Sequence, residues 1–169
     1  MHYFSGFSLR DESHFFKAFL KEGDYTVAGF SYGAIKAVEY AADTSERIET
    51  LQLFSPAFFQ AKPEKFKRLQ MMGYKKNSNS YLSSFIGSCF APYDVQKVYQ
   101  VQTISQELEA LLYYVWDLEM LQSLIDRGIR IEVYLGSEDH VIDANAAKEL
   151  FLPYATTYLI NHANHFLQT

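Results

Sequence analysis

The sequence predicts an α/β protein built around a mostly parallel sheet of about five strands. Short apolar or β-branched runs recur along the chain, with helical patterns or turn residues between them. Several runs are apolar almost throughout, which is typical of parallel strands covered on both faces. With 169 residues and 49% apolar composition, the chain can bury a sizeable core. The five predicted strands are His2–Phe7, Tyr25–Phe30, Thr50–Ser55, Arg130–Leu135 and Thr156–Ile160.

A helix is expected between the first two strands. Asp11 can act as its N-cap, and Gly23 can end it. The apolar residues that would share one side of this helix are Phe15, Phe16, Phe19 and Leu20. The helix would form one crossover connection between parallel strands.

A helical cap is predicted for residues 60–128, which contain no convincing strand. Pro63 suits the first position of a helix. The clearest helical pattern begins at about Ser105 and stops at Gly128. Its apolar stripe consists of Leu108, Leu111, Leu112, Val115, Leu118, Leu121 and Leu124. We therefore expect one domain over residues 1–169, with the cap, about residues 60–128, inserted within it.

The charge balance is mildly acidic, with 15 Lys and Arg residues against 20 Asp and Glu residues and a formal net charge of −5. This balance provides no global attraction to nucleic acid or to an anionic membrane, so neither is expected as a partner. The one cysteine, Cys89, cannot form an internal disulfide and suits a reducing compartment. The first residues lack a signal-peptide pattern and no run is apolar enough to cross a bilayer, so a cytoplasmic protein is expected.

The strongest chemical signal is the segment Gly29–Gly33, which reads Gly-Phe-Ser-Tyr-Gly. It lies at the end of a predicted strand and just before the helical run Ala34–Ala42. A serine on such a sharp turn projects its hydroxyl from the sheet, and the flanking glycines leave room for the turn. The alternative is a chance match to a short pattern. The strand-turn-helix context favours Ser31 as a nucleophile.

A serine nucleophile needs a histidine base, and the histidine needs a carboxylate to fix its tautomer. The expected chain order is serine, acid, histidine. Three acidic residues follow the strand Arg130–Leu135, namely Glu138, Asp139 and Asp143. Asp143 directly precedes the helical run Ala144–Phe151 and suits its N-cap. We therefore favour Asp139 as the catalytic acid, with Glu138 as the alternative.

Two histidines, His162 and His165, follow the final predicted strand and are candidates for the base. We favour His165, because His162 lies closer to the strand. The remaining histidines, His2, His14 and His140, are expected to be structural or exposed. No histidine pair has the helical spacing of metal ligands, and one cysteine cannot make a zinc site. Neither a metal nor a cofactor is expected.

Two backbone N–H groups are needed to stabilise the oxyanion that forms during acyl transfer. Tyr32 follows the nucleophile and supplies one of them by position. The second is expected from the loop after the first strand, where Phe7 follows Ser5 and Gly6. The alternative is a simple glycine-containing turn at that point.

Segments spread over nearly the whole chain carry a resemblance to a known family. They are Tyr3–Phe7, Gly29–Ala37, Leu53–Pro56, Phe66–Gln70, Ile131–Val133 and Asn164–His165. With these segments, the chain resembles the α/β hydrolases and, among them, the short pimeloyl-acyl-carrier-protein methyl ester esterases of biotin synthesis, the BioV type. The turn around Ser31 is common to hydrolases, whereas the shortness of the chain together with the other segments points to this type. Larger relatives place an additional strand before the nucleophile, for which this chain leaves no room.

The resemblance implies a compact α/β-hydrolase fold in which the cap lies between the nucleophile and acid segments. It also implies a serine esterase that acts on a pimeloyl group carried by acyl carrier protein. Ser31 would attack the methyl ester carbonyl, methanol would leave, and water would release the free carboxylate. The carrier thioester at the other end of the acyl chain must survive, so selectivity has to come from placement.

One basic stretch stands out in this acidic chain and lies within the predicted cap. Residues 62–76 contain one acidic residue, Glu64. The basic residues in the same stretch are Lys62, Lys65, Lys67, Arg68, Lys75 and Lys76. Taken alone, such a run is usually a solvated helix face. Because acyl carrier proteins are acidic, the resemblance favours a docking site for the carrier instead.

Three functions therefore compete. The first is the carrier-dependent methyl esterase, and the second is a generic small carboxylesterase or acyl thioesterase. The third is a hydrolase-like module without catalysis that binds a carrier or another protein. The first two share a catalytic triad and differ in carrier dependence and in the released product, methanol or a thiol. The third differs from both in that Ser31 would not react with a fluorophosphonate.

Overall fold

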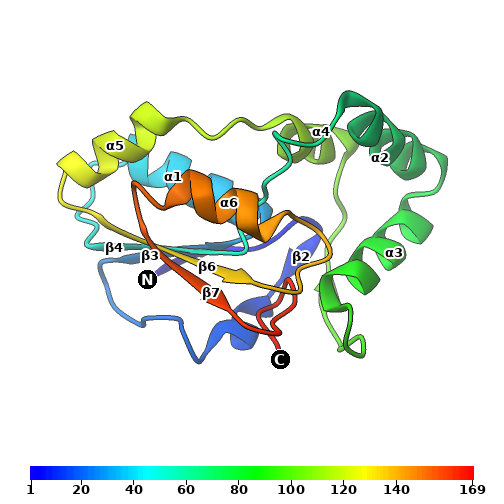
Figure 1. The fold of residues 1–169 in the computed structure, drawn as a ribbon, viewed down its shortest axis with the longest axis horizontal. Coiled ribbons are helices and arrows are strands. Elements are labelled where there is room, and N and C mark those ends of the chain that lie inside the picture. Colours follow the sequence, from blue (N-terminus) through cyan, green and yellow to red (C-terminus); the bar gives the residue numbers. More distant parts are fainter.

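A five-stranded sheet forms the centre of the computed structural model, which describes all 169 residues (Figure 1). The sheet has the strand order β1-β3-β4-β6-β7, and every neighbouring pair is parallel. The predicted parallel sheet is confirmed, although the first strand ends at Phe4 instead of Phe7. The strands are β1 (His2–Phe4), β3 (Thr26–Phe30), β4 (Thr50–Phe54), β6 (Arg130–Gly136) and β7 (Thr156–Ile160).

The strand register brings the candidate site residues to one edge of the sheet. Phe30 of β3 pairs with Phe54 of β4, which pairs with Tyr134 of β6. All residues of β3 and β4 are buried, which explains why their sequences are apolar almost throughout. The segments that follow these strands therefore emerge side by side at the carboxyl edge, where open α/β sheets bind their ligands.

Three helices cover one face of the sheet (Figure 1). They are α1 (Tyr32–Asp43), α5 (Leu118–Asp126) and α6 (Ala144–Phe151). Asp143 caps α6, as predicted, because its side chain accepts a hydrogen bond of 3.0 Å from the Ala146 N–H. The segment between β1 and β3 lies against the other face (Figure 1).

That segment does not form the helix predicted between Asp11 and Gly23. It contains a short 3₁₀ helix, η1 (Glu12–Phe16), and Asp11 has a left-handed backbone with φ 60° and no capping hydrogen bond. The buried side chain of Gln52 on β4 accepts from the Lys21 N–H (2.8 Å) and donates to the Phe19 carbonyl (3.0 Å). The Lys21 N–H and the Phe19 carbonyl thus have hydrogen-bond partners on the sheet and do not need partners within a longer helix.

Gln52 belongs to a polar network beneath the sheet. Its amide group also donates to Glu132, which is buried on β6 and contacts Lys21 and the Tyr134 hydroxyl. Burial alone would raise the pKa of Glu132, but hydrogen bonds from Lys21, Tyr134 and Gln52 outweigh it and hold the pKa below its usual value of 4.5. The network fixes the segment before β3 to the centre of the sheet.

The cap lies between β4 and β6. Its elements are α2 (Glu64–Lys76), α3 (Ser78–Phe90), β5 (Tyr99–Gln100), α4 (Ser105–Tyr113) and α5. Figure 1 shows α2, α3 and α4 together at one end of the sheet, whereas α5 crosses back over it. Cys89 of α3 is buried, as predicted, and burial is the main cause that raises the pKa of its thiol well above the usual value. No helix of the chain has both the length and the apolar character to cross a bilayer.

The long helix predicted from Ser105 to Gly128 is broken into α4 and α5. Trp116 turns inward between them, and its indole N–H donates to the Ala57 carbonyl (3.0 Å). The Trp116 backbone N–H donates to the Gln60 side chain (2.9 Å), so it is not available to a continuous helix. Asp117 then caps α5 through the N–H groups of its second and third residues.

The cap also contains a strand that the sequence did not predict. The two-residue strand β5 pairs antiparallel with β2 (Leu9–Arg10), which follows the loop after β1. Next to this pair, the Ser8 hydroxyl donates to the Val101 carbonyl (2.8 Å), and the Val101 N–H donates to the Ser8 carbonyl (3.0 Å). The returning end of the cap is therefore attached to the loop that contains Phe7.

Candidate active site

Ser31 occupies a strained turn between β3 and α1. Its backbone has φ 52° and ψ −114°, a combination that residues other than glycine rarely adopt. The Ser31 N–H donates to the Phe54 carbonyl (2.9 Å), and the Ser31 carbonyl accepts from Ala34 (3.0 Å) and Ala57 (3.1 Å). Backbone groups of β4, of the segment after it and of α1 thus hold the strained residue, as a sharp strand-to-helix turn requires.

The two flanking glycines are needed for close backbone approach. A Cβ atom on Gly29 would lie 2.2 Å from the Gly33 carbonyl oxygen. A Cβ atom on Gly33 would lie 2.0 Å from the Phe4 carbonyl oxygen. No side chain fits at either position, so the pattern around Ser31 has a steric cause.

The side chains of Ser31, His165 and Asp139 form one hydrogen-bonded chain. The distance from Ser31 Oγ to His165 Nε2 is 3.1 Å, and the distance from His165 Nδ1 to Asp139 Oδ2 is 2.6 Å. The side chains of His165 and Asp139 are fully buried, and Ser31 is only 4% exposed. A buried carboxylate next to Nδ1 favours the tautomer in which Nδ1 carries the proton, which leaves Nε2 free to accept the serine proton.

Asp139 is itself held in place by the loop that contains it. Its Oδ1 atom accepts from the N–H groups of Val141 (2.7 Å) and Ile142 (3.0 Å). The other oxygen remains for His165. Asp139 thus has every feature of an acid that orients a histidine.

The two alternative candidates, Glu138 and His162, pair with each other. The distance from Glu138 Oε1 to His162 Nδ1 is 3.2 Å, and both side chains are exposed. No hydrogen bond joins either of them to Ser31. The other histidines, His2, His14 and His140, are exposed, and no three His, Cys, Asp or Glu side chains converge on a possible metal site.

The loop that carries His165 depends on contacts that the sequence analysis did not predict. A Cβ atom on Gly136 would lie 2.3 Å from the Ala163 carbonyl oxygen, so glycine is needed where the loop crosses the end of β6. The Asn164 side chain donates to the carbonyl of Phe90 in the cap (2.8 Å) and accepts from the Gln168 N–H (3.0 Å). Because Phe90 and Asn164 are 74 positions apart, no local pattern indicates this contact.

The two predicted oxyanion donors are both free. Tyr32 is the first residue of α1, so its N–H has no acceptor within the helix. Phe7 lies in the turn between β1 and β2, and its N–H makes no hydrogen bond within the protein. Gly33 packs directly against the Phe4 and Ser5 carbonyls, which places this turn next to the turn around Ser31.

Solved structures of several enzymes resemble this architecture. The naproxen esterase (carboxylesterase NP) of Bacillus subtilis is 16% identical, with a TM-score of 0.59 over 84% of this chain and 53% of that chain. Carboxylesterase CesB of the same organism is 17% identical, with a TM-score of 0.57 over 83% of this chain and 53% of that chain. E-2-(acetamidomethylene)succinate hydrolase is 12% identical, with a TM-score of 0.60 over 98% of this chain and 84% of that chain.

The chain has the α/β-hydrolase fold. It spans about half the length of the two carboxylesterases, 53% of each. No protein-family model matches the sequence, and no curated protein matches it significantly. The fold places the cap between the turn around Ser31 and the loop that contains Asp139, as predicted.

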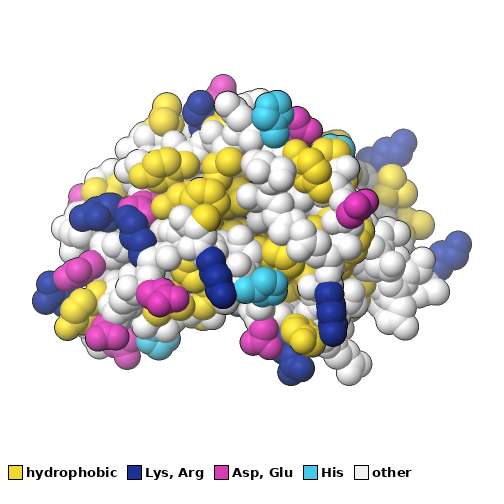
Figure 2. Space-filling model, turned by 90° about the horizontal axis from the view of Figure 1, so that it is seen from below, with side chains coloured by type: hydrophobic (Ala, Val, Ile, Leu, Met, Phe, Trp, Pro, Cys, Tyr) yellow, Lys and Arg dark blue, Asp and Glu magenta, His cyan; other side chains and the backbone are white.

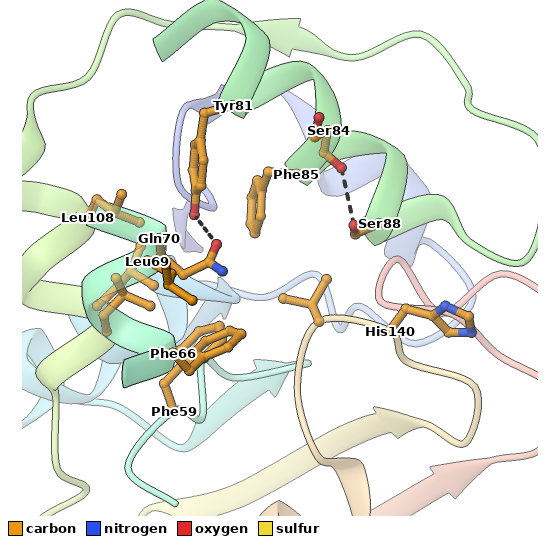
Figure 3. Close-up of a pocket in the computed structure, with 13 residues that line it drawn as sticks. Phe59, Phe66, Leu69, Gln70, Tyr81, Ser84, Phe85, Ser88, Leu108 and His140 are labelled. Carbon is orange, nitrogen blue, oxygen red and sulfur yellow. Dashed lines mark hydrogen bonds between the residues drawn. The ribbon is translucent and has the colours of Figure 1, made fainter. Parts of the chain in front are cut away.

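In this α/β-hydrolase fold, the cap and the loop after β6 line a largely apolar pocket of about 340 Å³ (Figure 3). Most of its lining residues are hydrophobic, and Phe59, Phe66 and Leu108 are examples. A polar edge is formed by the Tyr81 hydroxyl, which donates to the Gln70 side chain (2.9 Å; Figure 3). The lining residues are Phe59, Phe66, Leu69, Gln70, Tyr81, Ser84, Phe85, Ser88, Leu108, Leu111, Leu112, His140 and Val141.

Two lining residues connect this pocket to the candidate site. The ring of Phe85 packs edge-on against the ring of Phe7, with centroids 6.0 Å apart. Val141 donates its backbone N–H to Asp139. The pocket thus adjoins both the predicted oxyanion turn and the acid loop, although Ser31 itself does not line it.

The basic stretch of the cap divides into exposed and buried side chains. Lys65, Arg68, Lys75 and Lys76 are exposed. Lys67 is only 9% exposed, and its ammonium group lies over the Tyr113 ring at 5.0 Å from the centroid. The Lys67 charge is thus engaged within the protein and is less available to a partner than the exposed charges around it. Lys62 is half-buried with its ammonium group 5.5 Å from the Phe66 ring centroid.

Proposed function

We propose that the protein is a serine carboxylesterase with Ser31 as nucleophile, His165 as base and Asp139 as the orienting acid. The hydrogen-bonded chain from Ser31 Oγ through His165 to Asp139 carries this proposal. The similar solved structures include carboxylesterases of Bacillus subtilis, which supports the proposal.

In the proposed reaction, His165 Nε2 takes the proton of the Ser31 hydroxyl as Oγ attacks the ester carbonyl. The negative charge that forms on the carbonyl oxygen is stabilised by the N–H groups of Tyr32 and Phe7. The proton on His165 then passes to the departing alcohol, which leaves an acyl group on Ser31. Water attacks this acyl-enzyme with His165 again as base, and the free carboxylate departs.

The substrate we propose is the methyl ester of a pimeloyl group on acyl carrier protein, and the alcohol released is methanol. The proposed place of this reaction is biotin synthesis in the cytoplasm. Support comes from the resemblance of the sequence segments to that type of esterase and from the pocket next to the candidate site. A largely apolar pocket of about 340 Å³ suits a short acyl chain.

The exposed face of α2 supports the proposed carrier as a partner. Residues spaced by three or four positions share one helix face, and here they are Lys65, Arg68, Leu69, Met72 and Lys76. Leu69 and Met72 are 54% and 64% exposed, and Leu69 also lines the pocket. This face therefore combines positive charge with apolar anchors at the pocket, which suits an acidic protein that delivers an acyl chain.

The product identifies the reaction. We expect the purified protein to convert pimeloyl-carrier methyl ester to a carrier that has lost the mass of one methylene group, with methanol released. Mass spectrometry of the carrier makes this measurement. Release of the carrier thiol would indicate a thioesterase, and hydrolysis of small esters alone would indicate a generic carboxylesterase. A protein that leaves all of them intact and is not labelled by a fluorophosphonate would be a binding module.

Charge reversal on α2 should impair the reaction of the carrier-bound ester alone. We expect Lys65→Glu/Arg68→Glu to raise KM for this substrate about tenfold or more at low salt, because attraction becomes repulsion at the rim of the interface. The salt dependence of KM should weaken in the variant. The rate with a small p-nitrophenyl ester should stay within about twofold, since no carrier is involved.

The matched control reverses the same two residue types elsewhere. Lys17 and Arg130 are exposed, and Arg130 begins β6 at the opposite edge of the sheet from Ser31. Lys17→Glu/Arg130→Glu changes the net charge equally and should leave both substrates unaffected. Figure 2 shows that basic side chains also project from other parts of the surface, so this control separates local docking from total charge. Equal effects of the two variants would argue against docking on α2.

A further inference from the structure

A buried carboxyl group holds the turn that carries the Phe7 N–H. Glu12 of η1 is only 1% exposed. Its Oε1 atom accepts from the Gly6 N–H (2.8 Å) and from the Tyr3 hydroxyl (3.3 Å). Its Oε2 atom is buried and has no hydrogen-bond partner. No Lys or Arg forms an ion pair with Glu12.

Such a group is costly in a core. A buried carboxyl oxygen without a partner loses its hydration and regains nothing, so packing alone would favour an apolar residue at this position. Tyr3 supplies a durable donor, because burial, together with Glu12, raises the pKa of its hydroxyl. The shorter of the two hydrogen bonds to Glu12 comes from the Gly6 backbone, so Glu12 is the acceptor that holds this N–H.

The geometry of this turn connects the Gly6 backbone to the direction of the Phe7 N–H. The Gly6 carbonyl accepts from the Leu9 N–H (3.1 Å). Because a trans peptide is planar, the Phe7 N–H points away from the Gly6 carbonyl within the same plane. Glu12 fixes the Gly6 N–H on one side of the residue, and Leu9 fixes its carbonyl on the other. The direction of the Phe7 N–H is thereby fixed, although this group has no acceptor within the protein.

Packing reinforces this orientation. A Cβ atom on Gly6 would lie 2.8 Å from the ring of Phe30, the residue before Ser31. The turn therefore rests directly on the strand that carries the nucleophile. Without an acceptor for the Gly6 N–H, only the Leu9 hydrogen bond and the Phe30 contact would hold the Gly6–Phe7 segment, and glycine has the widest choice of backbone conformations.

We propose that Glu12 is a positioning residue that orients the Phe7 N–H toward the oxyanion formed on a substrate bound at Ser31. This inference rests on the proposed function. Glu12 does not contact the reacting atoms, and it acts through the backbone of Gly6. Its effect should therefore appear in the transition state and in analogues of it, with little effect on ground-state binding.

The test compares Glu12→Ala with the wild-type protein and with Glu22→Ala, a control at an exposed glutamate nearby in the chain. With a p-nitrophenyl ester, we expect Glu12→Ala to lower kcat by about 10- to 100-fold, because an oriented oxyanion donor contributes on the order of 10²–10³. KM should change by about twofold or less. Binding of phenylboronic acid, which forms a tetrahedral adduct with a serine, should weaken by a factor similar to the loss in kcat.

Two further variants separate the effect of the Glu12 hydrogen-bond acceptor from the effect of its charge. They test the proposal even if Glu12→Ala folds poorly. Glu12→Gln keeps an oxygen for the Gly6 N–H and should recover kcat to within about fivefold of the wild type. Glu12→Asp keeps the charge but withdraws the acceptor by one methylene group and should lower kcat like Glu12→Ala. The reverse order, with aspartate active and glutamine impaired, would overturn the assignment.

The same experiment distinguishes this inference from the proposed function. Ester hydrolysis that Ser31→Ala abolishes supports the proposed function independently of Glu12. If the protein has this Ser31-dependent activity, and Glu12→Ala changes neither kcat nor the binding of phenylboronic acid, the proposed role of Glu12 is overturned and the proposed function is not. A protein without any Ser31-dependent hydrolysis would overturn both.

Discussion

Replacing Ser31 with alanine should lower kcat for a p-nitrophenyl ester by about a thousandfold or more, because the attacking atom is lost. The variant should also resist labelling by a fluorophosphonate, which reacts with an activated serine. Steady-state kinetics and mass analysis of the labelled protein measure the two effects.

The fold should survive this substitution. Ser31 Oγ makes one hydrogen bond, to His165, and the strained backbone is held by hydrogen bonds with other backbone groups that do not involve the side chain. We therefore expect the thermal unfolding temperature of Ser31→Ala to equal or exceed that of the wild type. Retained activity in a folded Ser31→Ala protein would rule out Ser31 as the nucleophile.

A second large effect is expected from the two residues behind Ser31, and the chain offers a matched control for each. His165→Ala should lower kcat by about a thousandfold or more, whereas His162→Ala should leave kcat within about threefold. The contrast follows from the geometry, since His165 reaches Ser31 and His162 forms an exposed pair with Glu138. An inactive His162→Ala protein with a nearly normal His165→Ala protein would reverse the assignment of the base.

The acid can be tested in the same way. In Asp139→Asn, the remaining carbonyl oxygen is needed by the N–H groups of Val141 and Ile142, so the new NH₂ group would face His165. A donor at that position favours the tautomer that cannot accept the serine proton. We expect kcat to fall by at least about a hundredfold, though less than in His165→Ala. Glu138→Gln should have no effect on kcat, and a loss there would instead favour Glu138 as the acid.

The features that the sequence predicted well are those with a local cause. The parallel strands are apolar because both faces are buried, and this appears directly in the residue pattern of β3 and β4. The turn around Ser31 could be predicted because close backbone contacts require two glycines within five residues, with the serine between them. The N-cap role of Asp143 follows equally from its neighbours in the chain.

The features that escaped prediction depend on partners far along the chain. The expected helix after Asp11 is replaced because Gln52 binds the backbone of Phe19 and Lys21. The break at Trp116 depends on the Ala57 carbonyl, and burial of Lys67 depends on Tyr113. The roles of Gly136 and Phe90 in holding the His165 loop have the same origin. To predict each of these features, one must know which segments meet in space. The periodicity of the sequence does not give this information.

The attachment of the cap to two separate loops constrains how the cap can move. Ser8 and Val101 join the cap to the turn that carries Phe7, and Asn164 joins the His165 loop to Phe90 at the end of α3. A cap that swung open as a rigid body would break these bonds and displace both loops at once. The cap thus helps to hold both loops of the candidate site in place. A chain shortened to the sheet alone would accordingly lose the hydrogen bonds that hold the two loops of the candidate site.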